Sequence, residues 1–143
     1  MRLQVCILTP DRIFQNKEVE EIILPTSTGQ IGVLNNHALL LTALDIGPII
    51  FRKKSNWIAL ALIGGFALVQ DNQVIILVNE AVASSSIEKR EVIKTLEETT
   101  NRLNQVSGEK AKVKATFTFK RARARYQIVK WPNKSQPSLR MLF

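Results

Sequence analysis

The chain has 143 residues, of which 45% are apolar and 22% are charged. This balance is typical of one folded domain with or without an appendage, and it excludes a wholly disordered chain. No apolar run reaches the roughly 18 residues that a membrane-spanning helix needs, because the longest, residues 57–69, contains Gly64-Gly65. The short apolar stretch 5–8, followed at once by Pro10, predicts neither a secretory signal nor a transit peptide.

Two residue types that carry chemistry occur only once each, as Cys6 and His37. A single cysteine excludes an internal disulfide, and the two together exclude multi-cysteine and multi-histidine metal sites, so no metal is expected. Cys6 lies in an apolar stretch and is expected to be buried and inert. No nucleophile or carboxylate motif accompanies His37, so no catalytic residue is predicted.

Positive charge is concentrated at the C-terminal end. Residues 1–108 carry 10 Lys and Arg and 11 Asp and Glu, whereas residues 109–143 carry 10 Lys and Arg and one acid, Glu109. The net charges are −1 and +9. A basic segment of this kind favours a polyanion or an acidic protein surface as its partner.

The first 85 residues have the pattern of short β-strands separated by turn residues. Apolar β-rich runs are found at 3–8, 19–24, 29–34, 39–44, 49–52, 57–63, 66–69 and 73–78. This spacing predicts an antiparallel sandwich or barrel, and Asp71-Asn72 between two runs predicts a hairpin turn. Gly64-Gly65 is expected to mark a bulge or a close backbone approach. The expected core residues are Ile13, Phe14, Ile22, Ile50, Trp57, Leu60, Leu62, Phe66, Ile76 and Val78.

The spacing of apolar residues changes after residue 85 from a strand pattern to a helical one. Residues 87–106 contain neither Gly nor Pro, and Val92, Leu96, Leu103 and Val106 follow helical spacing, which predicts a helix that ends at Ser107-Gly108. The three serines 84–86 are expected to supply its N-cap. The next element, about 113–130, fits two patterns equally: an apolar stripe of helical period and an alternation typical of a strand. Trp131-Pro132 ends it, and 133–143 have the composition of a loose tail.

The run Gly29-Gln30-Ile31-Gly32-Val33-Leu34-Asn35-Asn36-His37-Ala38 is similar to G-x-x-G-V-L-P-x-H-A, the signature of the epsilon subunits of rotary ATP synthases. Four further segments resemble this family, in detail its chloroplast form, and lie at the family's spacing: the opening 6–13, the blocks 64–67 and 78–81, and the basic stretch 121–125. The resemblance covers about residues 3–129.

This resemblance implies an α+β fold, with an N-terminal antiparallel β-sandwich followed by a C-terminal α-helical hairpin. It divides the chain into a sandwich at 1–85, a regulatory hairpin at 86–130 and a disordered tail at 131–143. It implies a non-catalytic subunit of the central stalk, which couples rotation of the proton ring to ATP synthesis and restrains ATP hydrolysis. The implied partners are the gamma subunit, ring subunit c and the catalytic alpha and beta subunits, at the stromal side of the chloroplast thylakoid membrane, with no nucleic acid.

Two groups of partner-binding residues follow from the resemblance. The first lies in the ring and gamma loop: Gln30, Asn35, Asn36 and His37. The second lies on the basic arm and is expected to contact the catalytic subunits: Lys114, Lys120, Arg121, Arg123 and Arg125. On a helix Arg121 and Arg125 share one face, so they are the main candidates for an acidic partner surface.

The sequence departs from the family pattern at three places. Asn35 and Leu39 stand where prolines are usual, which leaves the loop conformation open. Some bacterial members bind ATP through an I-D-x-x-R-A motif, whereas residues 87–92 here read I-E-K-R-E-V, so no nucleotide cofactor is expected. Without the resemblance, the basic segment would favour a β-domain with a nucleic-acid-binding arm, although RNP, zinc-finger and helix-turn-helix motifs are absent from the sequence.

Overall fold

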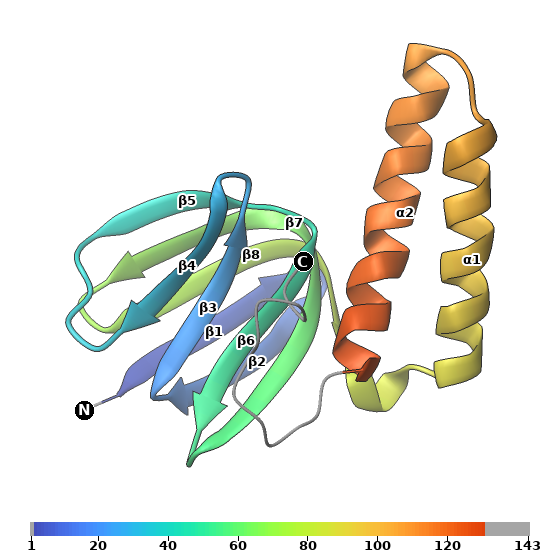
Figure 1. Cartoon of the computed structure of the whole chain (residues 1–143). Helices are drawn as coiled ribbons and strands as arrows, with labels where there is room; N and C mark the ends of the chain where they lie inside the picture. Colours follow the sequence, from blue (N-terminus) through green and yellow to red (C-terminus); the bar gives the residue numbers. More distant parts are fainter. Residues whose placement is uncertain (1, 131–143) are drawn as a thin grey trace.

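The computed structural model describes residues 2–130, so the predicted tail and the helix end at Trp131-Pro132 lie outside the described residues. A β-sandwich comes first and two antiparallel helices follow it, standing beside the sandwich as a separate pair (Figure 1). The strands are β1 Leu3–Thr9, β2 Arg12–Val19, β3 Glu21–Thr26, β4 Gly29–Leu34, β5 Leu40–Leu44, β6 Gly47–Lys53, β7 Asn56–Gln70 and β8 Gln73–Ala83. A short 3-10 turn, Ser84–Ser86, leads into α1 Lys89–Gln105 and α2 Glu109–Lys130.

The predicted antiparallel sandwich is confirmed, with one exception in strand direction. The order is β2-β1-β8-β7-β5-β3-β4, and β6 pairs with β3 and β7. All pairs are antiparallel except β1 with β8, which run parallel. Strand β7 is long enough to serve both sides of the sandwich, because its first half pairs with β6 and its second half with β5.

Two glycines in the middle of β7 allow this change of partner. The sequence predicted two strands, 57–63 and 66–69, but the structure has one. The pairing with β8 keeps its register across the glycines, so they do not form a bulge. They mark a close backbone approach instead, since a Cβ on Gly65 would lie 1.9 Å from the carbonyl oxygen of Leu77. The predicted turn at Asp71-Asn72 is confirmed, with φ of 50° and 61°, as a two-residue hairpin loop requires.

The sandwich core is built from alternate residues of its strands. The predicted core residues Ile22, Leu60, Leu62 and Ile76 are buried, as are Ile50, Trp57 and Val78, and Phe14 packs at the edge. Two core predictions were wrong: Ile13 is 62% exposed and Phe66 is 58% exposed. Both lie in strands with apolar residues on both faces, so the alternation alone did not say which face is inside. Cys6 is half-buried rather than fully buried.

Both C-terminal elements are helices, which decides the ambiguous second element in favour of a helix. The predicted serine cap of α1 was wrong, because the N-cap is Glu88 and makes no side-chain cap hydrogen bond. Ser86 Oγ instead donates to the carbonyl of Ala83 at 2.8 Å, which stabilises the turn between sandwich and hairpin. Thr116 and Thr118 donate back to the carbonyls of Lys112 and Lys114, so their hydroxyls are satisfied within α2.

The hairpin rests on the sandwich through a second, smaller apolar cluster. Ala124 and Ile128 of α2 are 1% exposed and pack on β6, β7 and β8. The sandwich side of this cluster is formed by Ile50, Trp57, Ala59, Ala61 and Val82. Since these residues lie near the C-terminal end of α2, the tip of the hairpin extends away from the sandwich (Figure 1).

The substitution Ile128→Ala is expected to undock the hairpin while the sandwich stays folded. Removing this buried side chain costs about 2–4 kcal/mol, and the main sandwich core contains no hairpin residue. Hydrogen exchange should show faster amides in 109–130 and unchanged amides in β7 and β8. The matched control, Val113→Ala on the same helix, removes a side chain that is 67% exposed and should change neither. Equal acceleration in sandwich and hairpin would contradict two separately stabilised units.

Candidate functional site

One outer face of the sandwich carries a continuous row of exposed apolar side chains. In β8 the buried Val74, Ile76 and Val78 alternate with Ile75 and Leu77, which point outward. The pairing register continues the row across the sheet, because Leu77 is opposite Phe66 of β7 and also opposite Leu8 of β1. We call this surface the apolar face; it consists of Leu8, Ile13, Leu39, Leu41, Phe66, Leu68, Ile75 and Leu77.

The members of the apolar face are too exposed to be part of the chain's own core. Leu41 is 71% exposed, Phe66 58% and Leu77 52%. A hollow of about 410 Å³ opens beside Phe66 and Leu77, bounded on its other side by Leu8 and Pro10. Large apolar patches on a folded protein mark surfaces that bind another protein or a membrane. No single residue in the sequence identified this surface. Its signal was the uninterrupted apolar run 74–78, which predicts a strand covered on both faces.

The predicted ring and gamma loop lies beside Leu39, at one end of the apolar face. Asn36 has φ +67°, and its N–H donates to Asn72 Oδ1 at 2.6 Å, which ties the loop to the β7–β8 turn. The Nδ2 of Asn72 donates to Asn36 Oδ1 at 3.4 Å. Nδ1 of the half-buried His37 lies 2.8 Å from the carbonyl oxygen of Ala38. These contacts stabilise the loop conformation in the absence of the family prolines.

The four predicted loop residues do not form one cluster. Asn35, Asn36 and His37 follow one another directly after β4, whereas Gln30 lies near the other end of that strand. Asn35 follows Gln30 by five positions of extended chain, a distance of roughly 16 Å along the strand. A partner that contacts all four must therefore cover the full length of β4.

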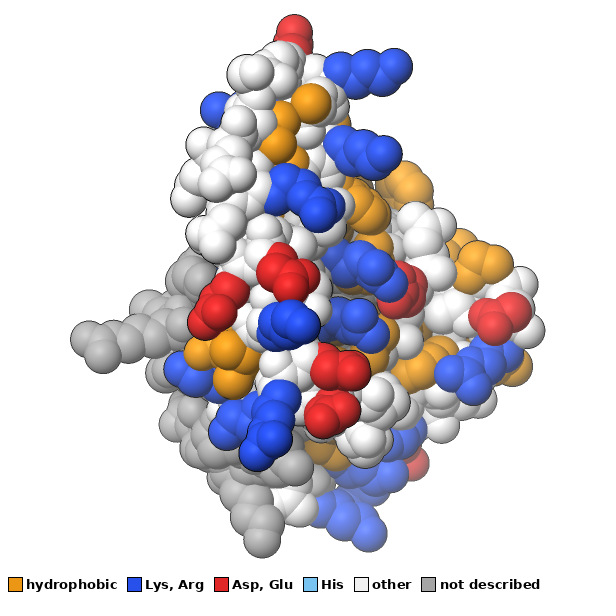
Figure 2. Space-filling view, turned by 90° about the vertical axis from the view of Figure 1, so that its right-hand side faces the viewer, with side chains coloured by type: hydrophobic (Ala, Val, Ile, Leu, Met, Phe, Trp, Pro, Cys, Tyr) orange, Lys and Arg blue, Asp and Glu red, His pale blue; other side chains and the backbone are white. Residues whose placement is uncertain are grey.

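The basic residues of α2 point in several directions. Lys114 is exposed, and Lys120 Nζ lies 3.7 Å from Asp45 Oδ1. Arg121 binds Glu80 through two hydrogen bonds, Nε to Oε2 at 3.0 Å and Nη2 to Oε1 at 2.7 Å. The guanidinium of Arg123 covers the Phe119 ring at 5.3 Å. Figure 2 shows Lys and Arg side chains in a column along the hairpin, with acidic side chains on both sides of its lower part.

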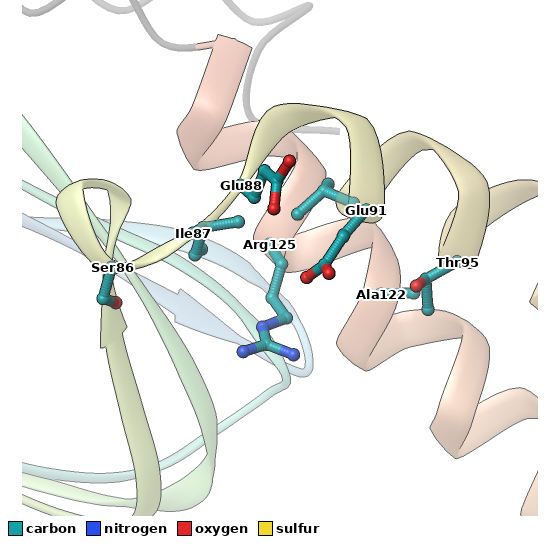
Figure 3. Close-up of a pocket in the computed structure, with 8 residues that line it drawn as sticks. Ser86, Ile87, Glu88, Glu91, Thr95, Ala122 and Arg125 are labelled. Atoms are coloured by element: carbon teal, nitrogen blue, oxygen red, sulfur yellow. The ribbon is translucent and has the colours of Figure 1, made fainter.

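Arg125 enters a small pocket at the junction of the turn, α1 and α2. The pocket measures about 110 Å³ and includes Ser86, Glu88 and Glu91 in its lining. Figure 3 shows the guanidinium reaching out from α2 below the start of α1. Arg125 Nε is buried and has no hydrogen-bond partner. Although Arg121 and Arg125 are one turn apart, Arg121 lies against β8 and Arg125 lies in the pocket between the 3-10 turn and the two helices, which we call the hinge pocket.

The hinge pocket does not suit a nucleotide. Its volume is below the about 300–1,000 Å³ that is usual for small-molecule sites. Glu88 and Glu91 carry two negative charges against the single positive charge of Arg125, so the lining has a net negative charge, which disfavours a phosphate. Within residues 2–130, no group of three or more His, Cys, Asp or Glu residues is placed to hold a metal ion. No helix of this described part is both long and apolar enough to cross a bilayer.

A β-sandwich with an exposed apolar face, and with a helical hairpin docked on another side, has the architecture of a subunit that binds another protein or a membrane surface. Residues 2–84 match the ATP synthase, Delta/Epsilon chain, beta-sandwich domain. The chain belongs to this family, and within it to the ATP synthase epsilon chains of the chloroplast type, as the sequence resemblance predicted.

Similar proteins support this assignment along nearly the whole chain. The chloroplastic ATP synthase epsilon chain of Chlorella vulgaris is 61% identical over 130 residues, which are 91% of this chain and 97% of the relative. That of Chlamydomonas reinhardtii is 48% identical over 136 residues, with 91% and 96% covered. A chain in the structure of the Euglena gracilis mitochondrial ATP synthase shares the fold at a TM-score of 0.76 and 23% identity, covering 86% of this chain and 78% of that chain.

Proposed function

We propose that this protein is a non-catalytic central-stalk subunit of a chloroplast ATP synthase, bound peripherally at the stromal side of the thylakoid membrane. The apolar face binds the gamma subunit, and the loop 35–37 lies toward the proton ring. The sandwich thereby helps to couple ring rotation to ATP synthesis. The hairpin reaches the catalytic alpha and beta subunits when it undocks, and it restrains ATP hydrolysis there.

The apolar face is the observation that carries this proposal. The hairpin covers β6, the first half of β7 and the C-terminal end of β8, whereas the apolar face spans β5, the second half of β7, the first half of β8, β1 and β2. The sandwich can therefore stay bound to a partner while the hairpin changes position. Pairing on both sides of β7 makes the sandwich one stiff body, as transmission of torque requires.

The charge pattern of α2 supports a protein partner over a nucleic acid. A nucleic-acid arm needs its cations free to contact phosphates. Here Lys120 and Arg121 already bind carboxylates and Arg125 lies in the hinge pocket. These residues therefore favour acidic side chains, which a catalytic subunit can supply.

A titration of ATP hydrolysis tests the proposal. The full chain, and a version that ends at Ser86, are added to the catalytic head of a chloroplast ATP synthase depleted of its epsilon subunit. We expect the full chain to inhibit with saturation at one copy per head, and the shortened chain to bind with much less inhibition. All residues of the main sandwich core lie before residue 86, so the shortened chain keeps this core. Failure of the full chain to bind would contradict the proposal. Equal inhibition by the shortened chain would show that the hairpin is not needed to restrain ATP hydrolysis.

A further inference from the structure

The contact between hairpin and sandwich has a polar part in addition to its apolar cluster. Arg121 binds Glu80 of β8 side-on, through Nε and one terminal nitrogen. One position earlier, Lys120 lies 3.7 Å from Asp45, which is in the turn between β5 and β6. Two carboxylates from separate parts of the sandwich therefore meet two adjacent cations of α2.

These ion pairs are placed where water and salt can reach them. The side chains of Arg121 and Glu80 are 42% and 34% exposed, and those of Lys120 and Asp45 are 35% and 40% exposed. Pairs with this exposure change an equilibrium by only about two- to fivefold each, and salt screens them. They can therefore stabilise the docked position of the hairpin while still allowing it to undock.

The geometry of Arg121 also prevents a second carboxylate from binding it in the same way while the hairpin is docked. A guanidinium binds a carboxylate strongly by presenting two parallel N–H groups, and Glu80 occupies such a pair. A carboxylate of another protein would need to displace Glu80 to form the same contact. The docked hairpin thus masks two of the five cations that were assigned to an acidic partner surface.

We propose that Glu80 and Asp45 act as an internal latch, which occupies Arg121 and Lys120 in the docked hairpin and competes with an acidic partner for them. The identity of this partner, the catalytic subunits, rests on the proposed function above. The latch itself depends only on contacts within the chain and can be tested on the isolated protein.

Trp57 offers a built-in reporter of docking. It is 9% exposed and belongs to the cluster that Ala124 and Ile128 cover, so undocking exposes it to a soluble quencher. In a Trp131→Phe background it is the only tryptophan. We expect Glu80→Gln and Asp45→Asn each to raise the undocked fraction about two- to fivefold, measured by acrylamide quenching. We expect the effect to disappear at 1 M salt, where the Debye length is only about 3 Å.

Two controls distinguish loss of the latch from the general effect of removing one negative charge from the sandwich. Glu18→Gln neutralises an exposed carboxylate of β2, an edge strand that pairs with β1, and should leave quenching unchanged. The charge swap Glu80→Arg with Arg121→Glu should restore docking that either single change weakens. If acrylamide quenches Trp57 equally in Glu80→Gln and Glu18→Gln, the proposed latch is wrong. It is also wrong if the charge swap fails to restore docking.

The competition is then tested on the epsilon-depleted catalytic head. We expect Glu80→Gln to inhibit ATP hydrolysis at a concentration about two- to fivefold lower than the unmodified chain. A variant that undocks in isolation but inhibits no better would overturn the masking of Arg121. Failure of the unmodified chain to bind the head would instead contradict the proposed function, while the quenching result for the latch would stand.

Discussion

The substitution Leu77→Asp is expected to weaken binding to the epsilon-depleted ATP synthase head about thirtyfold. Leu77 is 52% exposed at the centre of the apolar face, where its neighbours across the sheet are Phe66 and Leu8. A central apolar anchor is worth about 2 kcal/mol or more at a protein interface, and a buried unpaired carboxylate adds to the loss. About 1.4 kcal/mol corresponds to a tenfold change in Kd.

The fold should tolerate this change, because the side chain lies outside the core. We expect the free energy of unfolding to stay within about 0.5 kcal/mol of the wild-type value. Phe66→Asp should act in the same way, and the two are made separately because two carboxylates directly opposite each other would repel. The matched control is Ile93→Asp, at a 38% exposed apolar position on α1. A Kd for Leu77→Asp within threefold of that control would contradict a binding role for the apolar face.

The substitution Gly65→Ala is expected to lower the free energy of unfolding by about 3–5 kcal/mol. The new Cβ would lie 1.9 Å from the carbonyl oxygen of Leu77 and 2.9 Å from Val78 Cα, and both are backbone atoms that cannot rotate away. Gly65 also has φ +153°, which a residue with a Cβ rarely adopts. Relief of the clash would separate β7 from β8 in the middle of the sandwich.

Urea unfolding of Gly65→Ala and Gly32→Ala measures this effect. Gly32 is the control because it also lies in a strand, but a Cβ there meets nothing within 4 Å. Its change should stay within about 1 kcal/mol. Since domains are stable by only about 5–15 kcal/mol, Gly65→Ala should unfold at a much lower urea concentration. Equal midpoints for the two variants would contradict the close approach.

Most of the sandwich could be predicted because its strands are separated by residues that favour turns. The exception is β2, which the sequence did not reveal. Its stretch RIFQNKEV is largely polar, and it is an edge strand that pairs only with β1. An edge strand with both faces partly exposed to solvent lacks the alternation of apolar and polar residues on which the prediction of a strand depends. The parallel pairing of β1 with β8 was also hidden, because it joins residues about 70 positions apart.

The candidate site was harder to predict than the fold. Ile13 and Phe66 were expected in the core because large apolar residues are usually buried, and only the strand register shows that they lie on an exposed surface. The ion pair of Arg121 with Glu80 spans 41 positions. Helical spacing correctly placed Arg121 one turn from Arg125, but it could not show which neighbour each side chain meets.

Site-specific photocrosslinking at Phe66 tests most directly whether the apolar face binds the gamma subunit. Phe66 is replaced by photoreactive benzoylphenylalanine, the chain is assembled with the epsilon-depleted head, and the crosslinked products are identified by mass spectrometry. The same group at the exposed Lys54, in the β6–β7 turn, is the control. We predict a gamma crosslink from position 66 in high yield and little from position 54. Crosslinks from position 66 to another subunit, or none from a chain that is bound, would contradict gamma binding through the apolar face.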